Sequence, residues 1–307
     1  MNTAVLFDRY GAPDALYATD VPIPAPGPGE VVVRYTAIGV NPIDWKILNG
    51  GLRAHIPMEL PGGCLGVEAA GVVVDVGAGV RRFRVGDPVI RHGRPGAYRE
   101  YEAVPASQEA DELTPQSGRF SAEQAAVLPV AAGTAYSALR QVGLRAGERL
   151  LVHGASGGVG LATVQLALLM GAEEVVGTAS AHHHDLLRRL GVTPVEYGDG
   201  LLERLEELGP FGASVDCAGG SQPTGVAVRL VSIPERRVTV ADLQARARGV
   251  PFLDHVPLEL ASTLDLIGHS PFELPIAARF PLAKAGEALE LGMRGGVGGK
   301  IVLLPGQ

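Results

Sequence analysis

The sequence contains few of the residues on which several kinds of site depend. Only two of its 307 residues are cysteine, Cys64 and Cys217, and they stand far apart without a CxxC partner. Two such residues cannot form a disulfide framework or a four-cysteine zinc site. We expect both to be small buried apolar residues.

Basic residues and long apolar runs are also scarce. The chain has 26 Lys and Arg against 33 Asp and Glu, which gives a formal net charge of −7. No broad basic field is therefore available to hold nucleic acid or an anionic membrane. No apolar run approaches the roughly 20 residues that span a bilayer, and the first residues do not follow a signal-peptide pattern. We expect a soluble, cytoplasmic protein without a nucleic-acid or membrane partner.

The residues that are present predict two domains. Short β-branched runs between prolines and glycines fill the first third, among them 30–40 and 69–77, and they indicate a β-rich domain. At Ser121 the pattern changes, because Ser121 and Gln124 match a capping box and strand and helix patterns then alternate. This alternation predicts a parallel sheet wrapped by helices. We assign 1–120 and 271–307 to the first domain, to which the last strand can return, and 121–270 to the second.

Residues 150–167, LLVHGASGGVGLATVQLA, contain an apolar strand, a glycine-rich turn and an apolar helix. Without side chains, Gly157 and Gly158 would let a pyrophosphate approach the backbone, and Gly160 would let the helix pack closely on the strand. Alanine (Ala155) replaces the first glycine of the usual fingerprint. The segment predicts a dinucleotide site; the other interpretation is a tight turn without a ligand.

The end of the next strand bears on the choice of dinucleotide. NAD-preferring sites carry an acid there that binds the ribose 2′-hydroxyl, whereas this chain has Ala179 and Ser180. No carboxylate would repel a 2′-phosphate, and donors to it are available, which favours NADP(H). These donors are Ser180, His182, His183 and Arg188. Adjacent histidines on a helix diverge by about 100°, which argues against a shared metal ion, and they can also be plain surface residues.

The chain resembles the zinc-independent quinone oxidoreductases, the zeta-crystallin-like members of the medium-chain dehydrogenase/reductase superfamily. The resemblance covers nearly the whole chain and rests on an ordered series that includes GVNPIDW, LPGGCLGVEAAGVVVDVG, AAVLPVAAGTAYSAL, LLVHGASGGVG and GKIVL. It implies an α/β protein in which a Rossmann domain, with a doubly wound parallel sheet, binds NADP(H). The other domain would be a GroES-like β-rich catalytic domain. The resemblance also implies a homodimer.

The resemblance further implies that Asn41 and Asp44 line the nicotinamide and substrate pocket and that Thr134 lies beside the nicotinamide. Asn41 can instead start a turn or cap a helix, and Thr134 can bond to its own helix backbone. Besides Asn41 and Thr134, the candidate cofactor residues are those expected to hold the pyrophosphate, surround the 2′-phosphate or cover the nicotinamide. They are Ser156, Gly157, Gly158, Val159, Gly160, Ser180, His182, His183, Tyr197, Val231, Ser232, Ile233, Phe252 and Leu253. Tyr197 can also be a partly buried aromatic residue.

Zinc alcohol dehydrogenases of this superfamily carry a cysteine where Asn41 stands and a histidine where Val67 precedes Glu68. Neither ligand is present, so we expect no metal, and alcohol oxidation would lack its main alkoxide stabiliser. A quinone or an activated C=C takes hydride at carbon, and its oxygen needs only a hydrogen-bond donor or a cation. Lys46 stands where many relatives carry tyrosine; it can stabilise an enolate or donate a proton, face solvent, or pair with Asp44.

The sequence thus predicts an NADPH-dependent, zinc-independent oxidoreductase that passes hydride to a quinone or to an activated C=C of an enone or enoyl acceptor, with Asn41, Asp44 and Lys46 as its candidate catalytic residues. Two alternatives remain open. One is a non-catalytic NADPH-binding sensor or structural protein, and the other is a tailoring enoyl reductase of secondary metabolism.

Overall fold

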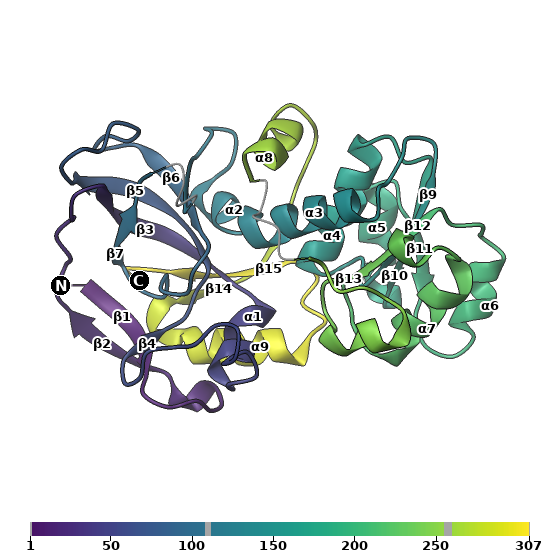
Figure 1. The fold of residues 1–307 in the computed structure, drawn as a ribbon, viewed down its shortest axis with the longest axis horizontal. Helices are drawn as coiled ribbons and strands as arrows, with labels where there is room; N and C mark the ends of the chain where they lie inside the picture. The colour runs from purple at the N-terminus through teal and green to yellow at the C-terminus, as the bar shows by residue number, and fades with distance from the viewer. Residues whose placement is uncertain (1, 108–111, 255–259, 307) are drawn as a thin grey trace. The chain divides into compact units, whose positions relative to one another are not determined.

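The computed structural model describes residues 2–107, 112–254 and 260–306 (Figure 1). The chain divides into two compact units. Unit 1 comprises Met1–Val130 and Pro275–Gln307, and unit 2 comprises Ala131–Leu274. Among the described residues, no helix is both long and apolar enough to cross a membrane.

Unit 1 is built mainly of strands. One sheet has the order β2-β1-β4, and the larger one has the order β14-β15-β3-β5-β6-β8, with β7 also paired to β3. The strands are β1 (Asn2–Phe7), β2 (Tyr17–Val21), β3 (Glu30–Val40), β4 (Gly63–Cys64), β5 (Glu68–Val76), β6 (Pro88–His92), β7 (Tyr101–Pro105), β8 (Leu113–Pro115), β14 (Ile276–Pro281) and β15 (Lys300–Leu304). The α-helices are α1 (Pro42–Leu48), α2 (Ala122–Ala126) and α9 (Ala285–Arg294).

The end of the chain returns to unit 1, as the sequence predicts. β15 pairs antiparallel with β3, with Ile301 opposite Val40. Val31, Val33 and Ile38 of β3 are fully buried in the unit's apolar core, so β3 holds the centre of the sheet. This pairing also brings the start of β15 to the end of β3, where α1 begins.

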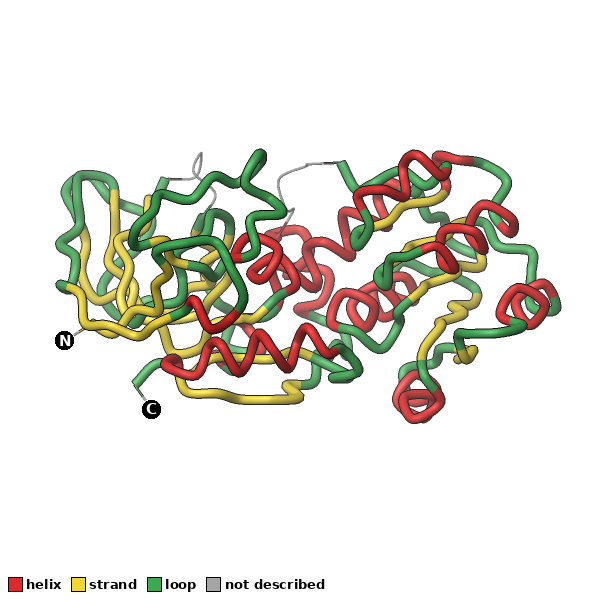
Figure 2. Tube along the Cα trace, turned by 90° about the horizontal axis from the view of Figure 1, so that it is seen from below, coloured by secondary structure: helices red, strands yellow, loops and turns green. Residues whose placement is uncertain are grey.

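Unit 2 contains the predicted parallel sheet. Its strand order is β11-β10-β9-β12-β13, and every pair is parallel. The strands are β9 (Arg149–His153), β10 (Glu174–Ala179), β11 (Thr193–Glu196), β12 (Ala213–Asp216) and β13 (Arg237–Thr239). The α-helices are α3 (Thr134–Gln141), α4 (Gly158–Leu169), α5 (His184–Arg189), α6 (Leu201–Glu206), α7 (Ser221–Leu230) and α8 (Leu260–Gly268). Figure 2 shows helices flanking these strands.

The strand order of unit 2 reverses beside β9. From β9 the chain adds β10 and β11 on one side, and it then crosses back to add β12 and β13 on the other. In open α/β sheets, the crevice at such a switch point, outside the carboxyl ends of the strands, is where ligands bind.

The capping box predicted at Ser121 is confirmed. The Gln124 N–H donates to Ser121 Oγ, and the Ser121 N–H donates to Gln124 Oε1, both at 3.2 Å. The helix that it starts, α2, packs against β3 and β5 of unit 1. The compact units accordingly divide after Val130, later in the chain than the change of sequence pattern at Ser121.

Candidate functional site

The glycine-rich turn joins β9 directly to α4. A Cβ built on Gly160 would lie 2.1 Å from the Gly154 oxygen and 2.8 Å from the Ala155 Cα, so only a hydrogen fits there. The first turn of α4 therefore packs on the backbone that precedes it. Within the described residues, no side chain caps this helix at Gly157. Its first N–H groups and its positive dipole end remain available to an anion.

A pocket of about 360 Å³ opens at the carboxyl ends of β9, β10 and β12, beside this turn. The pocket lies at the switch point of the sheet, where ligands bind in folds of this kind. Tyr197, one of the predicted cofactor residues, lines it with 57% of its surface exposed. The complete lining is His153, Gly154, Thr178, Ala179, Tyr197, Leu201, Ala218, Gly219, Gly220, Ser221, Gln222 and Pro223.

Two buried polar residues that the sequence analysis did not single out shape this pocket. Asp216 ends β12 and accepts hydrogen bonds from the N–H groups of Ala218 and Gly219, both at 2.9 Å, which fixes the pocket wall. His153 ends β9, and its Nδ1 lies 3.2 Å from Thr178 Oγ1. Burial lowers the pKa of His153 to about 4, against the attraction of Asp216, so the imidazole is neutral near pH 7. Both residues share a signal that the sequence could have offered: each is a polar residue that directly ends an apolar strand.

The candidate 2′-phosphate residues cluster after β10. Ser180 Oγ lies 3.5 Å from His182 Nε2, and the rings of His182 and His183 are in contact, with centroids 3.9 Å apart and planes tilted by 50°. Arg188 instead makes an exposed ion pair with Asp185 at 2.8 Å. Throughout the described part of the chain, no group of three or more His, Cys, Asp or Glu residues is arranged to hold a metal ion.

The residues predicted to cover the nicotinamide lie on two segments of unit 2. Val231 is buried at the end of α7, while residues 232 and 233 are exposed. Residues 252 and 253 run beside β13, where the Leu253 N–H donates to the Thr239 oxygen at 2.9 Å. Thr134, half-buried, is the first residue of α3.

In unit 1, Asn41 belongs to a closed polar cluster with Glu68 and Lys300, which we call the Asn41 cluster. Asn41 Nδ2 donates to Glu68 Oε1 at 2.8 Å, and Lys300 Nζ donates to the same oxygen at 3.1 Å and to Asn41 Oδ1. Asn41, Glu68 and Lys300 are exposed by only 1%, 0% and 5%. The second Glu68 oxygen accepts the Val130 N–H at 2.8 Å. Gly39 leaves room for this carboxylate, because a Cβ there would lie 2.2 Å from Oε1.

Asp44 is fully buried and accepts hydrogen bonds from three protein groups. Its Oδ2 accepts the Asn41 N–H at 2.8 Å and the Tyr98 hydroxyl at 3.1 Å, and its Oδ1 accepts the Gly66 N–H at 3.2 Å. Burial raises the pKa of Asp44 to about 7, while the hydrogen bonds that it accepts oppose this rise. The carboxyl group thereby closes the N-terminus of α1 and fixes the backbone of Asn41. Lys46 lies half-buried in the last turn of the same helix.

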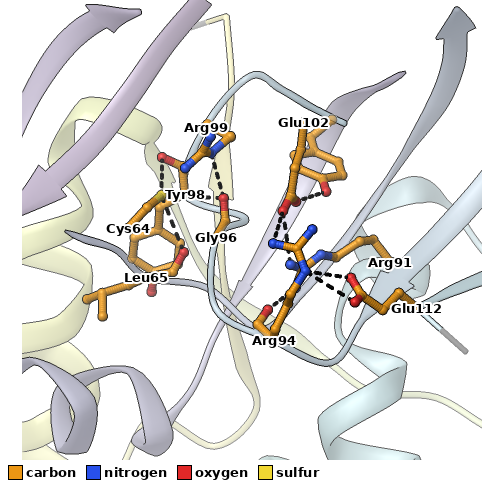
Figure 3. A network of polar contacts seen from close by, with 10 residues as sticks. Cys64, Leu65, Arg91, Arg94, Gly96, Tyr98, Arg99, Glu102 and Glu112 are labelled. Carbon is orange, nitrogen blue, oxygen red and sulfur yellow. Dashed lines mark hydrogen bonds and ion pairs between the residues drawn. The ribbon is translucent and has the colours of Figure 1, made fainter. Parts of the chain in front are cut away.

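A second buried network supports the segment that carries Tyr98 (Figure 3). Arg91, fully buried, pairs with Glu102 at 3.1 Å, and the Tyr35 hydroxyl donates to the same carboxylate. Cys64 Sγ lies 3.3 Å from the Gly96 oxygen. Cys64 is 5% exposed, as the sequence predicts, and burial raises the pKa of its thiol. For Cys217 the prediction of full burial was wrong, because this residue is partly exposed. The network ties residues 91–102 to the core of unit 1.

Comparisons with known proteins place this geometry in a family. Residues 27–113 match the alcohol dehydrogenase GroES-like domain. The chain is 31% identical over 326 residues to the chloroplastic quinone-oxidoreductase QR1 of Triphysaria versicolor, covering 98% of both proteins. It is 39% identical over 203 residues to the rat synaptic vesicle membrane protein VAT-1 homolog, covering 64% of this chain and 48% of that protein. The chain thus spans about half the length of this second relative.

The fold agrees with these similarities. The quinone oxidoreductase from Coxiella burnetii superimposes with a TM-score of 0.82 at 28% sequence identity, covering 99% of each chain. The GroES-like and Rossmann folds expected from the sequence are thereby confirmed. The chain belongs to the quinone oxidoreductases of the medium-chain dehydrogenase/reductase superfamily and is an oxidoreductase.

Proposed function

We propose that this chain is an NADPH-dependent oxidoreductase that transfers hydride, without zinc, to a quinone or to the activated C=C of an enone or enoyl acceptor. The observation that carries the proposal is the uncapped turn at Gly157 beside a pocket at the switch point, followed by a strand, β10, that ends without a carboxylate. The fold implies a nicotinamide cofactor, and the end of β10 favours the form that carries a 2′-phosphate.

The residues of unit 2 fit this cofactor. The backbone from Ser156 to Gly160 offers N–H groups to the pyrophosphate, apart from that of Gly157, which donates to the Gly154 oxygen at 3.1 Å. Ser180, His182, His183 and Tyr197 offer hydrogen-bond donors to the 2′-phosphate. We propose that the nicotinamide is held and covered by residues 134, 231–233 and 252–253. When bound, the nicotinamide supplies the hydride, and the protein supplies orientation and charge stabilisation.

The residues of unit 1 serve the acceptor. As hydride reaches carbon, negative charge develops on the acceptor oxygen, and a fixed donor in a dry site stabilises it. Asn41 and Lys46 are the candidate donors, and Asp44 acts as a positioning residue because its contacts are with α1, Gly66 and Tyr98. The Glu68 carboxylate is already bound by Asn41, Lys300 and Val130. This arrangement supports chemistry without zinc.

Calorimetric titration of the purified chain with NADPH and with NADH tests the cofactor. NADPH-oxidation assays with a benzoquinone, an enone, an enoyl thioester and an aldehyde then test the acceptor. We expect tighter binding of NADPH and turnover of a quinone or of an activated C=C. Tighter binding of NADH would contradict the cofactor assignment. Binding of NADPH by folded protein without turnover of any quinone, enone or enoyl thioester would contradict the enzymatic one and favour a sensor. We also propose a homodimer, which light scattering would check.

A further inference from the structure

The Asn41 cluster determines which way round the Asn41 amide lies. An ammonium group can only donate hydrogen bonds and a carboxylate can only accept them. The amide oxygen therefore faces Lys300, and the amide nitrogen faces Glu68. Turning the amide over would set NH₂ against the ammonium and oxygen against the carboxylate. It would thus replace two charge-assisted hydrogen bonds with two repulsive contacts.

Both partners of Asn41 are themselves fixed by the fold. Glu68 begins β5, its second oxygen is held by the Val130 N–H, and its carboxylate fills the space beside Gly39. Lys300 begins β15, the strand whose pairing with β3 places Ile301 opposite Val40. The backbone of Asn41 is fixed in turn by Asp44. The orientation of the amide is thus set by three strands and a helix cap rather than by one flexible neighbour.

We propose that Lys300 and Glu68 lock the Asn41 amide so that it offers a hydrogen-bond donor, and no acceptor, to the molecule that receives hydride. This inference rests on the proposed function, in which Asn41 faces the acceptor. The amide nitrogen carries two N–H groups, of which one bonds to Glu68. We assign the other to the ligand, which would have to reach it where Asn41 is now only 1% exposed. Lys300 is accordingly a positioning residue that acts through Asn41.

The lock defines a chemical class of acceptor. The charges of Lys300 and Glu68 offset each other, so the ligand meets an oriented N–H rather than a bare cation. An oriented N–H suits a carbonyl oxygen conjugated to the carbon that takes the hydride, because this oxygen becomes an enolate or phenolate and its hydrogen bond strengthens as charge develops. The acceptors favoured are quinones, enones and enoyl thioesters. An acceptor activated without such an oxygen gains nothing from Asn41.

A double-mutant cycle tests the lock with NADPH and 1,4-benzoquinone. We expect Lys300→Met to lower kcat/KM by about 100-fold, since a misplaced group near the reacting atoms costs roughly that much. In the Asn41→Ala background, the same substitution should cost less than about twofold, because the residue through which it acts is gone. Lys284→Met, which removes an exposed lysine paired with Glu287, is the matched control and should leave kcat/KM unchanged. Equal losses in both backgrounds would overturn the proposal.

A second measurement does not depend on turnover or on the stability of Lys300→Met. In ¹H–¹⁵N spectra, the Asn41 side-chain resonances are assigned by their loss in Asn41→Ala. We expect one amide proton to be shifted downfield by the carboxylate, and we expect Glu68→Gln to move it upfield. Resonances that stay in place in Glu68→Gln would overturn the lock. If the wild-type chain turns over no acceptor, the proposed function fails while this spectrum still decides the lock.

Discussion

Gly160, in the first turn of α4, is the glycine of the segment 157–160 where the structure leaves least room for a side chain. In an open helix, replacing glycine by alanine stabilises by about 1 kcal/mol. Here the new Cβ would lie 2.1 Å from the Gly154 oxygen, and the other close atoms are also backbone, so no side chain can yield. Overpacking costs about 1–3 kcal/mol. Because the clash is with backbone, we take the upper end of this range, about 3 kcal/mol, and subtract the gain of about 1 kcal/mol from helix propensity. We therefore expect Gly160→Ala to lower the free energy of unfolding by about 2 kcal/mol.

Gly157→Ala is the matched control, since it makes the same change three residues earlier. Its Cβ would meet the Gly154 oxygen at 3.5 Å, an ordinary contact, and its φ of −77° suits alanine. Thermal and urea unfolding should therefore show Gly160→Ala losing about 4–8 °C of Tm and Gly157→Ala losing much less. NADPH titration should show weaker binding for Gly157→Ala, because its methyl group lies where the pyrophosphate approaches. A Gly160→Ala variant as stable as wild type would refute this reasoning.

Three further predictions concern charge. Burial raises the Asp44 pKa to about 7, so the contribution of the protonated Asp44 to stability is full below about pH 4 and is lost as the pH rises towards 7. Urea unfolding should show wild type losing stability relative to Asp44→Asn across this window. A constant difference between the two proteins would contradict the raised pKa. Ser180→Asp should raise the Kd for NADPH relative to NADH by at least about tenfold, or about 1.4 kcal/mol, and an unchanged ratio in calorimetry would contradict the placement of the 2′-phosphate. Glu102→Gln leaves Arg91 buried without its partner charge and should lower the free energy of unfolding by about 3–5 kcal/mol. Glu112→Gln, at a half-exposed ion pair with Arg94, should lower it by under about 1 kcal/mol. Equal losses of the two variants in urea unfolding would contradict this difference.

Local patterns were sufficient to predict much of the fold. The β-branched runs at 30–40 and 69–77 form β3 and β5, and the capping box at Ser121 starts α2. The strand, turn and helix predicted around Gly160 are β9, residues 154–157 and α4. In each case the signal lies within a few residues, because periodicity, capping and glycine content are properties of one segment. The short exposed strand β2 and the three-residue β13 carry little periodic signal, and neither was predicted.

The contacts of Asn41 were beyond the reach of such patterns. Lys300 meets Asn41 across 259 residues, because β15 pairs with β3. A single lysine before an apolar strand does not indicate this partner. The environment of Asp44 has the same origin, since Tyr98 and Gly66 reach it from other parts of unit 1. The resemblance implied that Asp44 lines the substrate pocket, which stays a prediction; what it did not indicate is that Asp44 is buried and holds α1 and the Asn41 backbone.

The most direct test of the proposed function is the oxidation of NADPH, followed at 340 nm, by chelator-treated protein with 1,4-benzoquinone or an enone as acceptor. We expect consumption of NADPH matched mole for mole by reduced acceptor, at a rate that chelator treatment does not change and that exceeds the rate with NADH. A folded protein that consumes no NADPH, or whose activity is lost with the chelator and restored by zinc, would contradict it.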